Sequence, residues 1–156
     1  MSEKVSMQDL IPFMEEAFEN GQSFKIPIKG TSMLPLLVEG RDYVILEKPC
    51  GNLSVGELPL YKRNDGTFVL HRIVGKKEDG SYVLCGDNQF LKEYGITDEN
   101  VIGVVTAIIR DGKTFSVDDE KYKKYVQRSL KFLNVRYPYK RFRFILSKIK
   151  AKIVNK

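Results

Sequence analysis

The sequence predicts a mainly β fold: a curved sheet system or partly closed barrel with a short N-terminal helix and a basic C-terminal helical tail. Between residues 24 and 117, short β-branched and aromatic runs alternate with turn signals. Apolar residues follow a helical period before and after this region. The 156 residues, 42% hydrophobic and 29% charged, suffice for one core. We expect an amphipathic helix at 1–21, a core at 22–118 and a basic tail at 119–156.

The first element is predicted to be a short helix that Gly21 closes. Because proline is tolerated in the first turn of a helix but not in its interior, Pro12 favours Asp9 over Ser6 as the N-cap. One face of this helix should pack on the core. Its apolar residues are Leu10, Ile11, Met14, Ala17 and Phe18.

Seven runs are expected to form strands: 24–28, 42–47, 58–63, 67–74, 81–85, 101–109 and 114–117. Asp-Gly pairs separate three pairs of these runs, at 65–66, 79–80 and 111–112. Asp-Gly supplies the positive φ that tight hairpin turns require. Three hairpins are therefore predicted.

The tail carries two apolar stripes at helical spacing, with Pro138 between them. The first is Tyr122, Tyr125, Val126, Leu130 and Leu133, and the second is Phe142, Ile145, Leu146, Ile149 and Ile153. Residues 121–156 hold 13 of the 26 lysines and arginines and no acid, so residues 1–120 hold 13 bases and 20 acids. Such an arm is typical of proteins that bind phosphate-bearing partners.

Three roles are considered for the tail. Docking through residues 121–156 on an anionic membrane surface is slightly favoured over packing of the first stripe on the core. Nucleic acid is the third interpretation, because aromatic and basic residues interleave there. The longest uncharged runs have nine residues, against roughly 18 for a membrane span. The expected location is the cytoplasm, peripheral on the membrane.

No metal or cofactor is expected. Two cysteines are too few for a disulfide framework, and two cysteines with one histidine do not suggest a structural zinc site. Any chemistry should therefore come from the side chains of the chain itself.

A serine and the single histidine are the candidate reactive groups. Gly30 and Thr31 precede Ser32 after a predicted strand, and Pro35 then bends the chain away, which leaves Ser32 exposed on a turn. Serine is a poor nucleophile without a nearby base. Strand alternation places His71 among apolar neighbours, where the neutral imidazole is favoured. From strand position alone, a hydrogen-bonded core histidine is the more frequent role.

Five short blocks occur in an informative order between residues 30 and 105. They are Ser32-Met33-x-Pro35, Gly40-x-Asp42-x-Val44, His71-Arg72-Ile73-Val74, Gly86-Asp87-Asn88 and Gly103-Val104-Val105. This order resembles the catalytic core of the signal peptidase and LexA-like serine peptidase superfamily. It is most similar to the branch in which a His-Arg pair replaces the lysine base of the bacterial enzymes.

The resemblance implies a serine endopeptidase that cleaves an extended peptide or precursor protein through an acyl-enzyme. Ser32 would be the nucleophile and His71 its general base. Asp87 would support His71, with Asp98 as the competing acid. The alternatives are a non-cleaving peptide-binding or regulatory module and a nucleic-acid-binding protein that acts through its tail.

The resemblance also implies the surroundings of the nucleophile. The backbone N–H of Ser32 would donate to the oxyanion, with the Thr31 hydroxyl as a second donor. Met33 would contribute an apolar wall to the substrate site. Two positions depart from the signal peptidase pattern: Gly30 stands where a second serine is common, and Gly56-Glu57 replaces Gly-Asp. The sequence also lacks the usual hydrophobic anchor, so we do not expect signal-peptide cleavage on the outer membrane face.

Overall fold

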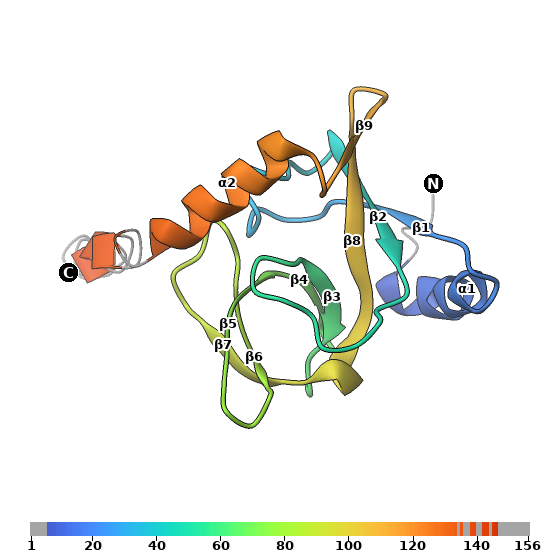
Figure 1. The fold of residues 1–156 in the computed structure, drawn as a ribbon, viewed down its shortest axis with the longest axis horizontal. Helices are drawn as coiled ribbons and strands as arrows, with labels where there is room; N and C mark the ends of the chain where they lie inside the picture. Colours follow the sequence, from blue (N-terminus) through green and yellow to red (C-terminus); the bar gives the residue numbers. More distant parts are fainter. Residues whose placement is uncertain (1–5, 134, 136–137, 140–141, 144, 147–156) are drawn as a thin grey trace, which may run out of the picture.

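The computed structural model describes residues 6–133, 135, 138–139, 142–143 and 145–146. It is mainly β, with a curled antiparallel half-barrel sheet, a small second sheet and a helix at either end of the core (Figure 1). The elements are α1 (Met7–Glu19), β1 (Phe24–Pro27), β2 (Asp42–Glu47), β3 (Pro59–Lys62), β4 (Phe68–Leu70), β5 (Arg72–Lys76), β6 (Tyr82–Cys85), β7 (Glu93–Ile96), η1 (Asp98–Asn100), β8 (Val101–Arg110), β9 (Lys113–Ser116) and α2 (Glu120–Lys131).

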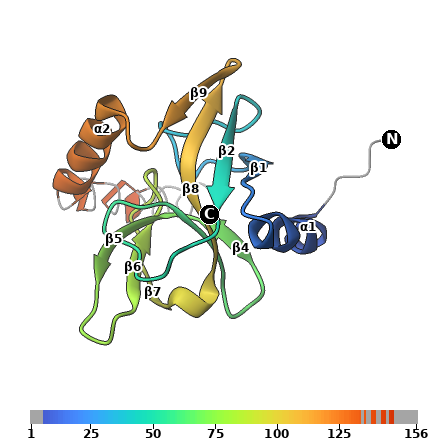
Figure 2. The same cartoon turned by 45° about the vertical axis from the view of Figure 1, so that its right-hand side comes forward.

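The half-barrel has the strand order β1-β2-β8-β3-β4, and β9 extends β8 as a hairpin. The small sheet has the order β5-β6-β7. Figure 2 shows α1 on one side of β8, and the small sheet and α2 on the other. The long strand β8 pairs with β2, β3 and β9, so it holds the half-barrel together.

All three predicted hairpins are confirmed: β3–β4, β5–β6 and β8–β9 are antiparallel pairs. In the last of them Asp111 and Gly112 have φ of 49° and 73°. Two successive residues with positive φ are what a two-residue hairpin turn of matching twist requires.

The N-cap predicted for α1 is wrong. Ser6, not Asp9, is the N-cap, because the two residues form a reciprocal capping box in which Asp9 N–H donates to Ser6 Oγ and Ser6 N–H to Asp9 Oδ2. Pro12 consequently lies inside the helix, on its solvent-exposed side. The predicted buried face is correct: Met14 and Phe18 are buried in the main core.

The predicted strand 67–74 is two strands in different sheets. β4 pairs with β3 in the half-barrel and β5 pairs with β6 in the small sheet, and His71 lies at the crossing between them. The expected alternation holds, because Phe68 and Leu70 pack on the half-barrel core while Val69 and Ile73 pack on the core of the small sheet.

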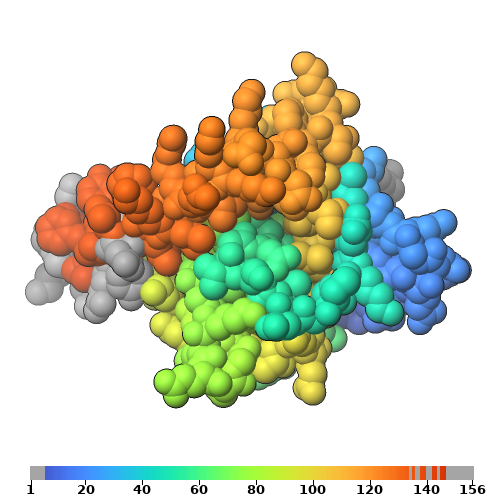
Figure 3. Space-filling model, in the orientation of Figure 1, coloured from blue at the N-terminus to red at the C-terminus, as the bar shows by residue number. Residues whose placement is uncertain are grey.

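The helix α2 packs on the body of the protein. Tyr122, Val126 and Leu130 face the segment before β3, where a β-carbon on Gly56 would lie 2.9 Å from Val126. Figure 3 shows α2 lying along this surface. The first stripe of the tail is therefore a core-packing stripe. In the second stripe Phe142, Ile145 and Leu146 are exposed, and the positions 149 and 153 lie outside the described residues.

Within the described part of the chain, no helix has the length and apolar character needed to cross a membrane.

Candidate active site

The turn that carries Ser32 connects β1 to β2 and is held from two sides. Met33 is buried in the core of the half-barrel, which anchors the turn to the sheet. From the loop after β6, the Asn88 backbone N–H donates to the Ser32 carbonyl (2.7 Å) and its side-chain amide donates to the Thr31 carbonyl (3.1 Å). Ser32 itself is half-buried, and no hydrogen bond of its hydroxyl to another described residue is present. The backbone that carries the Ser32 hydroxyl is thus held by the core and by the loop after β6.

A glycine makes this close approach of the two loops feasible. A β-carbon at Gly86 would lie 2.6 Å from the Ser32 carbonyl oxygen, closer than real β-carbons come to any atom. The loop after β6 can therefore support the Ser32 turn only with glycine at this position.

Gly86→Ala is expected to displace Ser32 and to slow its acylation about a hundredfold, since misplacement by about 1 Å costs that much. The measurement is the rate of labelling by a fluorophosphonate, followed by intact mass. Gly75→Ala is the matched control, because its β-carbon would meet Val83 at an ordinary 3.8 Å. Equal labelling rates for both variants would contradict the supporting role of Gly86.

His71 is buried, with 2% of its surface exposed, and its Nδ1 has a carboxylate partner. Nδ1 lies 2.8 Å from Glu93 Oε1 and 3.3 Å from the Tyr61 hydroxyl. A carboxylate accepts hydrogen bonds, so this contact places the proton of the neutral ring on Nδ1 and leaves Nε2 as the acceptor. His71 therefore has the tautomer of a general base.

Glu93 is in turn held by an arginine. Arg63 donates from Nε to Glu93 Oε2 (2.7 Å) and from Nη2 to Oε1 (2.6 Å). Burial by itself would raise the pKa of Glu93, but the hydrogen bonds from Arg63 and Tyr61 and the nearby charges hold that pKa below its ordinary value. Glu93 is therefore ionised at neutral pH. The two hydrogen bonds from Arg63 fix the orientation of its carboxylate toward His71.

Burial also controls the charge of His71. It lowers the pKa of the imidazole below the ordinary 6.5, and the opposing effect of Glu93 is smaller. His71 is thus neutral at pH 7. Burial, followed by the charge of Glu93, also raises the pKa of Tyr61, so this hydroxyl stays protonated.

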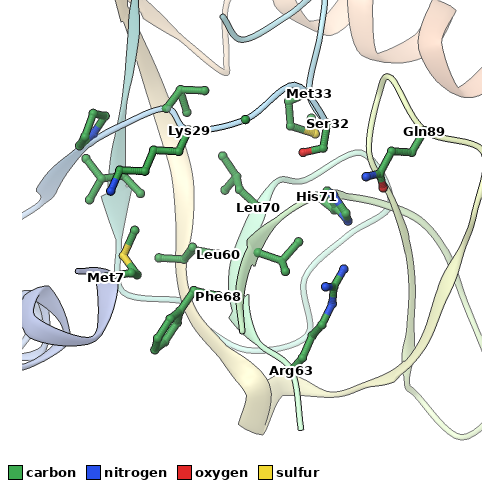
Figure 4. A pocket seen from close by; sticks show the side chains of 15 residues that line it. Met7, Lys29, Ser32, Met33, Leu60, Arg63, Phe68, Leu70, His71 and Gln89 are labelled. Carbon is green, nitrogen blue, oxygen red and sulfur yellow. The ribbon is translucent and has the colours of Figure 1, made fainter. Parts of the chain in front are cut away.

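Ser32 and His71 line the same cavity of about 350 Å³ (Figure 4). Figure 4 shows both side chains facing this opening, with Gln89 approaching from the loop after β6 and Arg63 from the end of β3. The remaining wall is largely apolar, with Ile26, Ile28, Met33, Leu60, Phe68 and Leu70. The predicted Ser32, His71 and Met33 are thereby brought together, whereas Thr31 is exposed and is not part of the cavity lining.

The structure does not place Asp87 or Asp98 on His71. Asp87 forms a buried two-pronged ion pair with Arg72, from Nε (2.9 Å) and Nη2 (2.7 Å). Asp98 accepts from the Tyr82 hydroxyl and from the Asn52 backbone N–H. The carboxylate in contact with Nδ1 is Glu93, whereas Asp87 contacts Arg72 and acts on His71 only through its charge, which raises the His71 pKa.

Glu93 was not predicted as a site residue because strand β7, which carries it, was not predicted. This strand spans only four residues and contains Gly95, so its pattern was too short to stand out. The one available signal was an acid at the start of a short run with an aromatic and a β-branched residue. Its proximity to His71 depends on the pairing of β7 with β6, which sequence spacing does not show.

The Arg72–Asp87 pair connects the site to α2. Tyr125 donates to Asp87 Oδ2 (3.0 Å), and Ser129 lies 3.4 Å from Oδ1. Arg72 also donates to the Gly56 carbonyl (2.8 Å) and lies over the rings of Tyr122 and Tyr125. The loop after β6, which supports Ser32, is therefore tied to the C-terminal helix.

Among the described residues, no group of His, Cys, Asp and Glu side chains is arranged to hold a metal ion. Comparisons of the chain with protein families, curated proteins and solved structures found no match. The site is therefore described by its geometry: a half-buried serine and a buried, neutral histidine line one cavity, and a carboxylate contacts Nδ1 of the histidine.

The rate of acylation of Ser32 is expected to be constant through pH 7 and to fall only below pH 6.5, because protonation removes the acceptor at His71 Nε2 and burial lowers the His71 pKa. The free energy of unfolding should also fall as the pH is lowered. The folded pKa lies below the unfolded one, so stability from neutral His71 is present above pH 6.5 and is lost as pH falls through the folded value. Labelling rates from pH 5 to 8, with circular dichroism as the folding control, test this. An acid limb centred above 6.5 would contradict it.

Proposed function

We propose that this protein is a serine endopeptidase in which Ser32 is the nucleophile, His71 the general base and Glu93 the carboxylate that orients His71. The observation that carries the proposal is the 2.8 Å contact between His71 Nδ1 and Glu93, beside a cavity that Ser32 shares. The resemblance of the Ser32, His71 and Gly86-Asp87-Asn88 blocks to the signal peptidase and LexA-like superfamily supports it independently.

The proposed reaction begins with a peptide bond placed in the cavity beside Ser32. Ser32 Oγ attacks the carbonyl carbon while His71 Nε2 takes its proton, and Glu93 stabilises the resulting imidazolium. The backbone N–H of Ser32 donates to the carbonyl oxygen as it becomes negative. The imidazolium then gives the proton to the leaving amine, the C–N bond breaks and an acyl-enzyme remains. Water, deprotonated by His71, hydrolyses this ester and restores Ser32.

The substrate in this proposal is an extended peptide with an apolar side chain. β4 is the last strand in the half-barrel order, so one edge of its backbone is not paired within the sheet. It borders the cavity through Phe68 and Leu70. An extended peptide can add to such an edge through main-chain hydrogen bonds while its side chains enter the adjacent pocket. The apolar lining, Met33 included, then selects an apolar residue.

A fluorophosphonate probe tests the proposed nucleophile. The wild type is expected to gain one adduct by intact mass, and Ser32→Ala is expected to gain none while melting at the same temperature. Ser23→Ala is the control, because this serine is exposed and lies outside the cavity lining. An adduct that survives in Ser32→Ala would contradict the assignment. Peptide binding without an adduct or cleavage would instead favour a non-cleaving peptide-binding module.

A further inference from the structure

Large apolar side chains lie exposed beyond the last turn of α2. They are Phe132, Val135, Tyr139, Phe142, Ile145 and Leu146, here called the C-terminal apolar surface, and each is 40–66% exposed. Where the structure describes residues 135 to 146, the backbone is helical. Successive members are mostly three or four positions apart, which is the spacing of residues along one side of a helix. Contiguous exposed apolar residues of this kind mark an interaction site.

This surface is distinct from the stripe that packs on the core. Tyr122, Val126 and Leu130 already face the body of the protein, and Leu133 is the last buried residue of the stripe at 6% exposure. Figure 1 shows the residues that follow at the end of the molecule opposite α1. None of the cavity residues around Ser32 belongs to this surface.

The charge of the same segment indicates what the surface binds. Residues 121–156 contain 13 lysines and arginines and no acid, and the described Lys131 and Arg143 are exposed. Arg143 lies 6.0 Å from the ring centre of Tyr139, so a cation borders the apolar side chains directly. An anionic partner is therefore favoured, and the tail of a second copy, with the same charge, would be repelled.

The types of apolar residue distinguish a lipid surface from a nucleic acid. Val135, Ile145 and Leu146 have aliphatic side chains, which cannot stack on bases as aromatic rings do. Aliphatic and aromatic side chains next to lysines and arginines do fit the boundary between lipid headgroups and acyl chains. A lipid surface therefore matches both features of the C-terminal apolar surface, its positive charge and its aliphatic side chains.

We propose that the C-terminal apolar surface docks the protein on an anionic lipid bilayer, with Phe142 and Ile145 among the side chains that enter the headgroup boundary. This attachment uses no residue of the Ser32 cavity and does not depend on the proposed peptidase activity. α2 and the Tyr125–Asp87 hydrogen bond connect the docked segment to the loop that supports Ser32.

Flotation of the full chain with vesicles tests the proposal. The wild type is expected to float with phosphatidylcholine vesicles that contain 30% phosphatidylglycerol, as a probe composition, and to be released by 0.5 M salt. Phe142→Ser/Ile145→Ser is expected to reduce the bound fraction about tenfold. Phe13→Ser is the matched control and should bind as the wild type does, because Phe13 is exposed to the same 61% as Phe142 but lies on α1.

Three results would overturn the proposal. One is absence of flotation with anionic vesicles, and another is equal, salt-independent binding to pure phosphatidylcholine. The third is binding of a single-stranded oligonucleotide, or dimerisation in sedimentation, that Phe142→Ser/Ile145→Ser abolishes while flotation is unchanged. Labelling of Ser32 by the fluorophosphonate should be the same in all these variants without vesicles, so failure of docking is distinguishable from failure of the peptidase proposal.

Discussion

Glu93→Gln is expected to slow acylation of Ser32 by a factor of about 10³ to 10⁴. Glutamine keeps the shape of the side chain, and its carbonyl can still accept from Arg63. With that carbonyl on Arg63 Nε, the amide NH₂ would take the place of Oε1, where it would face His71 Nδ1 and would no longer accept from Arg63 Nη2. The imidazole would respond by carrying its proton on Nε2, the nitrogen that has to accept the Ser32 proton.

Two further measurements make this prediction specific. Glu93 raises the His71 pKa against the effect of burial, so Glu93→Gln should also move the acid limb of the labelling rate to lower pH. Asp98→Asn is the control acid, because Asp98 binds Tyr82 and Asn52 and should leave the rate within about twofold. Full-rate labelling of Glu93→Gln, or a large loss in Asp98→Asn, would refute the role assigned to Glu93.

Arg72→Met is expected to lower the free energy of unfolding by about 3–5 kcal/mol. The side chains of Arg72 and Asp87 are only 1% and 2% exposed, and they form a two-pronged pair. Removing the arginine takes two charge-assisted hydrogen bonds from a buried carboxylate. Burial alone would lower the pKa of Arg72, but the hydrogen bond and charge of Asp87, together with Tyr122, outweigh burial and raise this pKa, so the guanidinium is charged in the folded protein.

Urea unfolding of single and double variants measures this coupling. Asp87→Leu should be destabilised to a similar extent, because the buried guanidinium of Arg72 then loses the carboxylate with which it pairs. Arg72→Met/Asp87→Leu should recover much of the loss, since two apolar side chains of similar volume leave no buried charge. Additive losses in the double variant would show that the two residues act separately. Lys123→Met is the surface control, because both partners of the Lys123–Asp118 ion pair are exposed, so its loss should change the free energy of unfolding little.

The local features of the fold could be predicted because neighbouring residues determine them. The Asp-Gly pairs marked all three hairpins, since only a few residues adopt positive φ without strain. Alternation placed Val69 and Ile73 on one face and Phe68 and Leu70 on the other. The N-cap of α1 was misassigned because a capping box at Ser6 and Asp9 outweighed the cost of a proline on an exposed helix side.

The candidate site was predicted only in part. Ser32 and His71 were singled out by residue type, local context and resemblance, and the structure places both on one cavity. The acid that contacts His71 was not predicted, and Asp87, which the resemblance suggested, pairs with Arg72, fifteen residues before it in the chain. Glu93 reaches His71 only because the chain crosses between two sheets at His71 and β7 returns beside β6.

The sequence by itself determined the two helices, the three hairpins and the charge division between body and tail, and it singled out Ser32 and His71 as candidates. The tertiary structure decided which acid contacts His71, which acid pairs with Arg72, and which apolar residues of the tail are buried. The physical reason is that turns and periodicity depend on residues a few positions apart. Ion pairs and burial depend instead on groups that only the packing of two sheets and α2 brings together.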